Sequence, residues 1–246
     1  CRMVLELLQY AFFQKALVIA ILASVAAGVV GTYIVIKRIS LITGSIAHTA
    51  FGGLGLSFFM GFNPLLGATG FSLLAAGVIS FFRKRAQYRL DTLLSFLWST
   101  GMAIGLVFLF MTPGYATDLF TFLFGNILLV GSFDLFLIAV LNVAVLLTVA
   151  ALYNNLLAIS FDEEYAESRN LPVNALYFIL FALIAITIVA VIRVVGIVLM
   201  IAILTIPPAT ARMFSKTVKK TMLFSILISL FAMLGGLFLS VFLDFP

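Results

Sequence analysis

Residues 37–53, with the sequence KRISLITGSIAHTAFGG, contain the turn between the first two apolar segments of the chain. The chain leaves a long apolar segment through two adjacent cations, Lys37 and Arg38, and then enters a second apolar segment. That segment carries His48, the only histidine in the sequence. An imidazole at membrane depth is expected to have a partner or a task. We therefore expect a transmembrane pathway that this segment lines.

The composition is that of an integral membrane protein. Of the 246 residues, 64% are hydrophobic and 9% are charged, whereas a soluble domain carries about 25% charged residues. The apolar runs are about 20 residues long, which is typical of spanning helices and not of the short alternating strands of a barrel. The expected fold class is an all-α integral membrane protein, with a single transmembrane domain over residues 1–246.

The net charge of +5 is an orientation signal, because the cations lie in short loops. It therefore indicates a lipid bilayer as the surroundings and no nucleic acid. No hydrophilic segment has the length of a soluble domain, so any ATP-binding or substrate-capturing part must belong to another chain.

About eight transmembrane helices are expected from runs long enough to cross a bilayer. We predict spans over residues 13–36, 45–61, 65–82, 92–111, 133–153, 175–192, 195–211 and 222–243. If these spans alternate, the basic segments 37–38, 83–89 and 212–220 lie on one side, which the positive-inside rule places in the cytoplasm. Segment 118–130 is too short to cross alone, so it is predicted to be a short re-entrant or outer-surface helix.

An acidic segment follows the fifth predicted span. Ser160 and Glu163 have the spacing of a capping box, Asn170 suits a left-handed helix end, and Pro172 prevents continuation. The pattern predicts a short helix on the cytoplasmic face within residues 160–172, where the resemblance given below implies a cytoplasmic coupling helix. A solvated connector and a docking helix for a cytoplasmic partner both remain open. For a docking helix, negative charge among basic loops favours a specific contact over attachment to the lipid surface.

Two adjacent prolines, Pro207 and Pro208, lie inside the predicted span 195–211. They remove two backbone donors and free the carbonyls four residues earlier. At membrane depth such carbonyls are tolerated only inside protein or beside water. We expect a helix break here, either as a packing kink or as a flexible part of a transport pathway.

The polar residues of the spans are few. Imidazole binds zinc, copper, iron and nickel and accepts manganese, so His48 is favoured as a metal or pathway residue. One histidine is too few for a closed structural zinc site. Asp91 and Asp118 lie near span ends, where capping is the default role. Ser45, Thr49 and Asp118 are nevertheless candidates for the pathway or its gate.

Five short stretches carry a family resemblance in the order in which they occur. They are KRISL (37–41) with AHT (47–49), DT (91–92) with TGMAIG (100–105), DL (118–119) with LFGNIL (123–128), FDEEYA (161–166) with LPV (171–173), and IPPATAR (206–212). Each stretch is a weak signal alone, and the ordered set is strong. The chain, from about residue 5 to 245, resembles the permease subunit of the metal-ion (zinc, manganese or iron) importers of the ATP-binding-cassette (ABC) class.

The resemblance implies a transport subunit that is not an enzyme, in the cell membrane of a prokaryote. It implies a homodimer with a second permease copy, two cytoplasmic ATP-binding subunits and an extracytoplasmic metal-binding protein. The divalent metal ion (zinc, manganese or iron) is then the transported substrate, with no tightly bound cofactor. The implied ATPase-coupling residues are Asp162, Glu163, Glu164, Tyr165, Ala166 and Glu167.

One residue departs from the family pattern. In the family an aspartate lies four residues before the histidine, and the two side chains are the expected gate or metal contacts. This chain has Gly44 at that position, so only His48 is carried over. Relatives also continue past the region that matches the last residues here into one more helix.

Two other classes of function are weighed. An ATP-independent secondary transporter or channel for a small cation predicts ionisable pairs within the spans, which hold almost none besides His48. An intramembrane enzyme needs a nucleophile or a metal motif such as His-Glu-x-x-His, which the sequence lacks.

Overall fold

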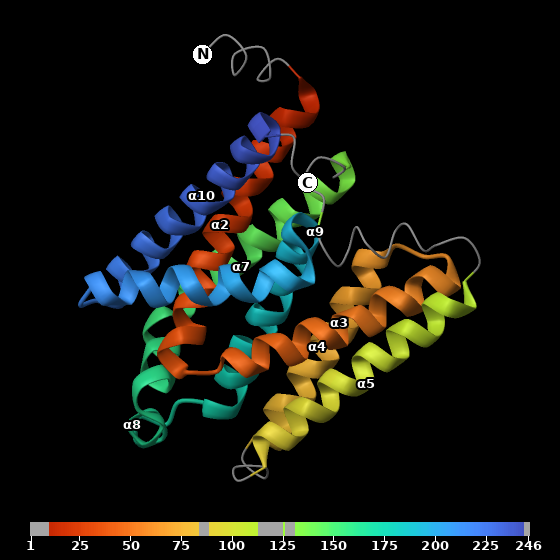
Figure 1. Ribbon diagram of the computed structural model, residues 1–246. Helices are drawn as coiled ribbons and strands as arrows, with labels where there is room; N and C mark the ends of the chain where they lie inside the picture. The colour runs from red at the N-terminus through yellow and green to blue at the C-terminus, as the bar shows by residue number, and fades with distance from the viewer. Residues whose placement is uncertain (1–9, 84–88, 113–124, 126–130, 244–246) are drawn as a thin grey trace.

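The computed structural model describes residues 10–83, 89–112, 125 and 131–243 of the chain. Within this part every regular element is an α-helix, and eight helical stretches are long and apolar enough to cross a membrane. Figure 1 shows these helices packed into one bundle, in which α3, α4 and α5 lie together at one side. The predicted all-α membrane fold is confirmed.

The first four spans are α2 (Ala11–Lys37), α3 (Ser40–Met60), α4 (Pro64–Phe82) and α5 (Leu90–Met111). Among these four spans, the largest departure from the predicted bounds is the start of α3, which was expected at residue 45. The chain reverses within two residues because Arg38 adopts a left-handed conformation with φ 57°. No linker is needed, and the second helix begins at once.

The remaining elements are α7 (Ser132–Phe161), α8 (Glu163–Ser168), α9 (Val173–Phe214) and α10 (Val218–Leu243). Helix α7 passes its predicted end at residue 153 because Leu156 and Ile159 are fully buried and extend its apolar face. The predicted helix over 118–130 lies outside the described residues, apart from Gly125.

The short helix expected within residues 160–172 is present as α8, but its predicted cap was wrong. Ser160 lies in α7 and donates back to a carbonyl of that helix. Asp162 is the N-cap instead, and its carboxylate accepts a hydrogen bond from the Tyr165 backbone N–H at 2.9 Å. Asn170 has the predicted left-handed conformation, with φ 54°.

The helix break predicted at Pro207 and Pro208 was also misplaced. Helix α9 continues through both prolines, and its non-helical residue is Gly196, with φ 77° and ψ 171°. These angles are open to glycine because a Cβ would clash with the backbone. Helix α9 holds two candidate spans, Val173–Ile192 and Val194–Phe214, and Gly196 lies in the first turn of the second.

Close packing explains why the prolines are tolerated. Pro208 leaves the Leu204 carbonyl without its usual helical donor. That oxygen lies against Gly31 of α2, where a Cβ would come within 2.6 Å of it. The freed carbonyl is thereby enclosed by protein and kept away from lipid.

The basic segments gather at the end of the molecule that carries α8. The Lys37 amine donates to the Ile159 carbonyl near the end of α7 at 2.8 Å. Arg83 pairs with Glu163 of α8 at 2.8 Å, and Lys219 lies over an aromatic ring of α7. Figure 1 shows the α2–α3 turn, the end of α4 and α8 at this same end. Among the described residues, the ends of α2, α4 and α7 and the start of α10 thus lie near one another, as the predicted alternation of the spans requires.

Glycines let α3 approach its two neighbours closely. A Cβ on Gly53 would collide with the Gly67 backbone of α4, and a Cβ on Gly55 with the Gly105 backbone of α5. Small residues at such contacts are the usual means of close packing between membrane helices. This packing places the histidine-bearing helix directly against α5.

Candidate functional site

His48 lies midway along α3, half-buried at the contact with α5. Its ring stacks on the indole of Trp98, with 4.1 Å between ring centroids and 24° between the planes. Its Nδ1 atom is buried and has no hydrogen-bond partner among the described residues. The histidine is therefore held by an aromatic neighbour, which leaves a ring nitrogen unsatisfied.

Trp98 also occupies the space beside Gly44. A Cβ built on Gly44 would collide with the six-membered ring of the indole. At the position where the resemblance leads us to expect an aspartate, the indole thus occupies the space into which a carboxylate would project. Sequence reasoning missed Trp98, although it is the only tryptophan in the chain and has Ser95 and Ser99 on either side.

The hydroxyls of Ser45 and Thr49 join α3 to α5. Ser45 Oγ donates to the Leu94 carbonyl at 2.9 Å. Thr49 Oγ1 donates to the Leu97 carbonyl at 3.2 Å and to a carbonyl of its own helix at 2.8 Å. Both side chains are buried, and they lie at the same α3–α5 contact as His48.

A hollow of about 260 Å³ opens beside this contact. Its lining comes from α3 and α5 and comprises Leu41, Ser45, Asp91, Leu94, Ser95, Trp98 and Ser99. Asp91 lies in the first turn of α5 and is exposed, in keeping with a role at the helix start. The hollow therefore joins a carboxylate and three hydroxyls to the tryptophan that covers His48.

The other predicted pathway residue, Asp118, lies outside the described residues. In the part of the chain that the structure describes, no three side chains of His, Cys, Asp or Glu gather as a metal site. The possible ligands for a cation at this site are one imidazole nitrogen, that of His48, and the separate side-chain oxygen atoms that line the hollow. Such ligands suit passage better than tight capture.

The six predicted coupling residues fall on two faces of α8. Ala166 is fully buried and Glu163 is partly buried, so these two face the bundle. The opposite face combines acidic side chains with two aromatic side chains, Phe161 and Tyr165, which are 62% and 51% exposed. We call this surface the acidic docking face, and it consists of Phe161, Asp162, Glu164, Tyr165 and Glu167.

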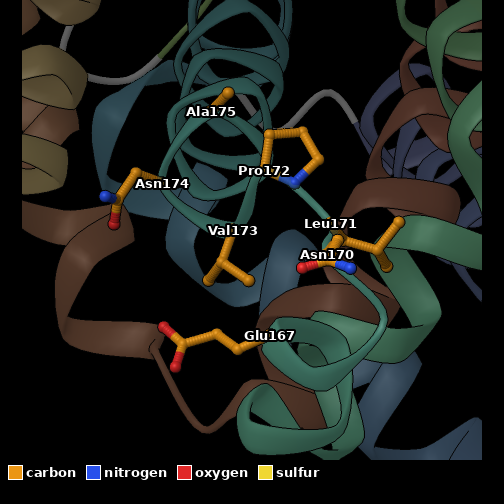
Figure 2. Close-up of a pocket in the computed structure, with 7 residues that line it drawn as sticks. All are labelled: Glu167, Asn170, Leu171, Pro172, Val173, Asn174 and Ala175. Carbon is orange, nitrogen blue, oxygen red and sulfur yellow. The ribbon is translucent and has the colours of Figure 1, made fainter.

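A second hollow, of about 560 Å³, lies where α8 leads into α9. It is lined by Glu167, Asn170, Leu171, Pro172, Val173, Asn174 and Ala175. Figure 2 shows the side chains of Glu167 and Asn174 projecting to the same side of this hollow. The acidic docking face therefore continues into a concave surface that combines polar and apolar side chains.

Comparison with known proteins gives consistent matches along the chain. The model of the ABC 3 transport family matches residues 9–246. An uncharacterized membrane protein of Synechocystis is 42% identical over 217 residues, which are 88% of this chain and 77% of that protein. The manganese import system permease protein ScaB of Streptococcus gordonii is 33% identical, over 93% of this chain and 82% of its own length.

A solved structure agrees with these sequence matches. It is PsaBC from Streptococcus pneumoniae in complex with Fab, and it superposes with a TM-score of 0.88 at 32% identity. The match covers 98% of this chain and 88% of that one. The arrangement of helices is thus shared over essentially the whole chain.

Proposed function

This chain belongs to the ABC 3 transport family, and from that premise we propose that its cargo is Mn²⁺, carried along the contact between α3 and α5. The chain is the membrane permease subunit of an ATP-driven metal importer in the bacterial plasma membrane. It is a transport component and not an enzyme, and it works with ATPase and substrate-binding partners. The observation that carries the choice of metal is the 33% identity with a manganese import permease over 93% of the chain.

The chemistry beside His48 supports this cargo. Mn²⁺ accepts carboxylate, hydroxyl and water oxygens and also imidazole nitrogen. The hollow beside Trp98 supplies Asp91, Ser45, Ser95 and Ser99, and the buried Nδ1 of His48 is unsatisfied among the described residues. A path with few and weak ligands lets the ion leave as well as enter.

A second copy of the chain is the proposed cover for the open side of this path. In the most apolar window of α5 only 17% of the residues are buried, against 78% for α3. The exposed side of α5 includes Asp91, Ser95 and Ser99, which lipid would solvate poorly. Two copies meeting at α5 would enclose these groups, so we propose a homodimer with the pathway at its interface.

ATP hydrolysis on the partner subunits would drive α8. The acidic docking face is the proposed contact surface, because its two aromatic side chains can anchor in a pocket while its carboxylates attract a basic partner. Movement of α8 would rock the spans between outward-open and inward-open states. The permease itself would supply the path and transmit the movement of α8 to the spans, and it would form or break no covalent bond.

The test is ATP hydrolysis by the reconstituted complex with Mn²⁺, Zn²⁺ and Fe²⁺ offered in turn through the metal-binding partner. Hydrolysis and uptake should respond most strongly to Mn²⁺. A stronger response to Zn²⁺ or Fe²⁺ would contradict the proposed cargo. Mn²⁺ uptake by the chain alone, with no ATPase, would instead favour a secondary transporter or channel.

A further inference from the structure

We propose that Lys37, Arg83, Glu163 and Tyr177 form a clamp that transmits the movement of α8 to the spans. Resting on the proposed function, this assigns Glu163 as a positioning residue of transport and not as a contact to the ATPase. The four residues come from the end of α2, the end of α4, α8 and the start of α9. The name "clamp" refers below to these four side chains.

Glu163 is bound on its inner side. Its Oε2 accepts a hydrogen bond from Arg83 Nη1 at 2.8 Å, in an ion pair, and a second from the Tyr177 hydroxyl at 3.0 Å. The Arg83 side chain is 15% exposed and that of Glu163 is 32% exposed. Hydrogen bonds between ionised groups in such partly buried positions are the strong ones. The Glu163 carboxylate is therefore bound by side chains of the helix bundle.

Tyr177 is the centre of the clamp. Its hydroxyl accepts a hydrogen bond from Lys37 Nζ at 2.6 Å while donating to Glu163. The Arg83 guanidinium carbon lies 3.6 Å from the centre of its ring, which adds a cation–π contact. One buried side chain thus joins two cations and one carboxylate.

Lys37 extends the clamp to a further helix. Its amine also donates to the Ile159 carbonyl in the last turn of α7 at 2.8 Å. A cation on these terminal carbonyls is favoured by the helix dipole. The ends of α2 and α7 are thereby joined to each other, close to the point at which the chain leaves α7 and enters α8.

The position of α8 depends on such contacts. A six-residue helix does not hold its own shape or place in isolation. Only Asp162 separates α8 from α7, so a push on α8 alone would bend this joint. With Glu163 held by Arg83 and Tyr177, the same push reaches α4 and α9 as well. The clamp converts a local displacement into movement of several spans.

The test uses affinity-tagged permease purified with its partner subunits from bacterial membranes and reconstituted in liposomes. Glu163→Gln removes the charge of the carboxylate, and Tyr177→Phe removes the shared hydroxyl while keeping the ring. Both variants should keep the ATPase bound. The number of Mn²⁺ ions imported per ATP hydrolysed should fall roughly tenfold, the factor that corresponds to a lost hydrogen bond to a charged group.

Two controls distinguish a loss of movement transmitted from α8 to the spans from a loss of stability of the complex. Lys220→Gln removes an exposed cation at the same end of the molecule, and it should leave the Mn²⁺-to-ATP ratio at the wild-type value. Arg83→Lys keeps the positive charge and should retain more of the ratio than Arg83→Gln does. Melting temperatures of the purified complexes are measured alongside.

Two outcomes would overturn the clamp. One is a lower melting temperature with an unchanged Mn²⁺-to-ATP ratio in Glu163→Gln and Tyr177→Phe, which would make the cluster a support only. The other is loss of the ATPase during purification of Glu163→Gln, which would return this residue to the docking surface. Failure of the wild-type complex to import Mn²⁺ with ATP would contradict the proposed function itself.

Discussion

Trp98 fills the space beside Gly44 and lies flat against His48, so the three residues act as one unit. The indole excludes a side chain at position 44, so in the proposed path the imidazole would be the nitrogen ligand at this point. A bulky ring over a ligand also limits how many groups can reach a cation at once. In the proposed path, selectivity at this point would then depend on the ring as much as on the histidine.

Removal of the imidazole tests whether His48 contacts the cargo. His48→Ala should lower Mn²⁺ uptake about tenfold or more, as loss of a group close to a metal commonly does. The ATPase should still co-purify, because α8 is far along the chain from this contact. Uptake equal to wild type for Mn²⁺, Zn²⁺ and Fe²⁺ alike would show that the histidine has a structural role.

A carboxylate can be restored one helical turn before the histidine. Gly44→Asp alone should destabilise the permease by about 1–3 kcal/mol, because the new side chain overpacks against Trp98. Combined with Trp98→Ala, the same change should allow tighter Mn²⁺ binding than in wild type, measured by the electron paramagnetic resonance signal of free Mn²⁺. Trp98→Ala alone is the control, and equal binding by the two variants would contradict the expectation.

At the scale of elements, Gly196 is the residue at which helix α9 is interrupted. Its φ of 77° would strain any other residue, and the backbone of residues 194–196 also lies against Gly125. Helix α9 is not interrupted at Pro207 and Pro208, because the Leu204 carbonyl that Pro208 frees packs against Gly31 of α2. Proline chemistry alone therefore pointed to the wrong residue.

Substitution at this corner should be costly. Gly196→Ala is expected to lower the stability of the purified permease by about 1–3 kcal/mol from backbone strain, seen as a lower melting temperature in detergent. Gly235→Ala is the matched control, since that glycine lies inside α10 with open space around its Cα. The control should be neutral or stabilising by up to about 1 kcal/mol. Equal melting temperatures for both variants would argue against strain at Gly196.

Substitutions on the two faces of α8 should have different effects on ATPase binding: Glu163→Gln should leave it intact, whereas a change on the acidic docking face should weaken it. Tyr165→Ala on the acidic docking face should weaken ATPase binding by roughly 2 kcal/mol, as loss of an aromatic anchor at an interface does. The readout is the amount of ATPase retained by tagged permease at rising salt. Full retention at every salt concentration would remove this face from the contact.

At the scale of the whole molecule, the basic segments and α8 share one end, and the α3–α4 turn lies at the other end of α3. By the positive-inside rule the basic end is cytoplasmic. In a Cys1→Ser background, Ser168→Cys should react with a membrane-impermeant maleimide only after the cells are opened. Phe62→Cys, at the exposed α3–α4 turn, should react in intact cells. The reverse pattern would invert the proposed orientation.

Several features followed from the sequence by itself. A bilayer demands long apolar helices whose backbone groups are satisfied internally, so the length of each run was enough to place eight spans. The cations at 37–38, 83–89 and 212–220 set the sidedness. The acidic, proline-ended segment after the fifth span indicated a short helix, because capping and termination are local.

Only the tertiary structure decided the rest, because these features depend on contacts between residues far apart in the chain. Gly44 was visible as a departure, yet the indole that fills its place comes from another helix. Glu163 was grouped with its exposed acidic neighbours until Arg83 and Tyr177 met it from two other helices. The break in α9 lies at Gly196, whereas the helix continues through Pro208, whose freed carbonyl lies against Gly31 of α2. Apolar periodicity determines that helices cross the membrane, and side-chain packing between them determines what each polar residue is able to do.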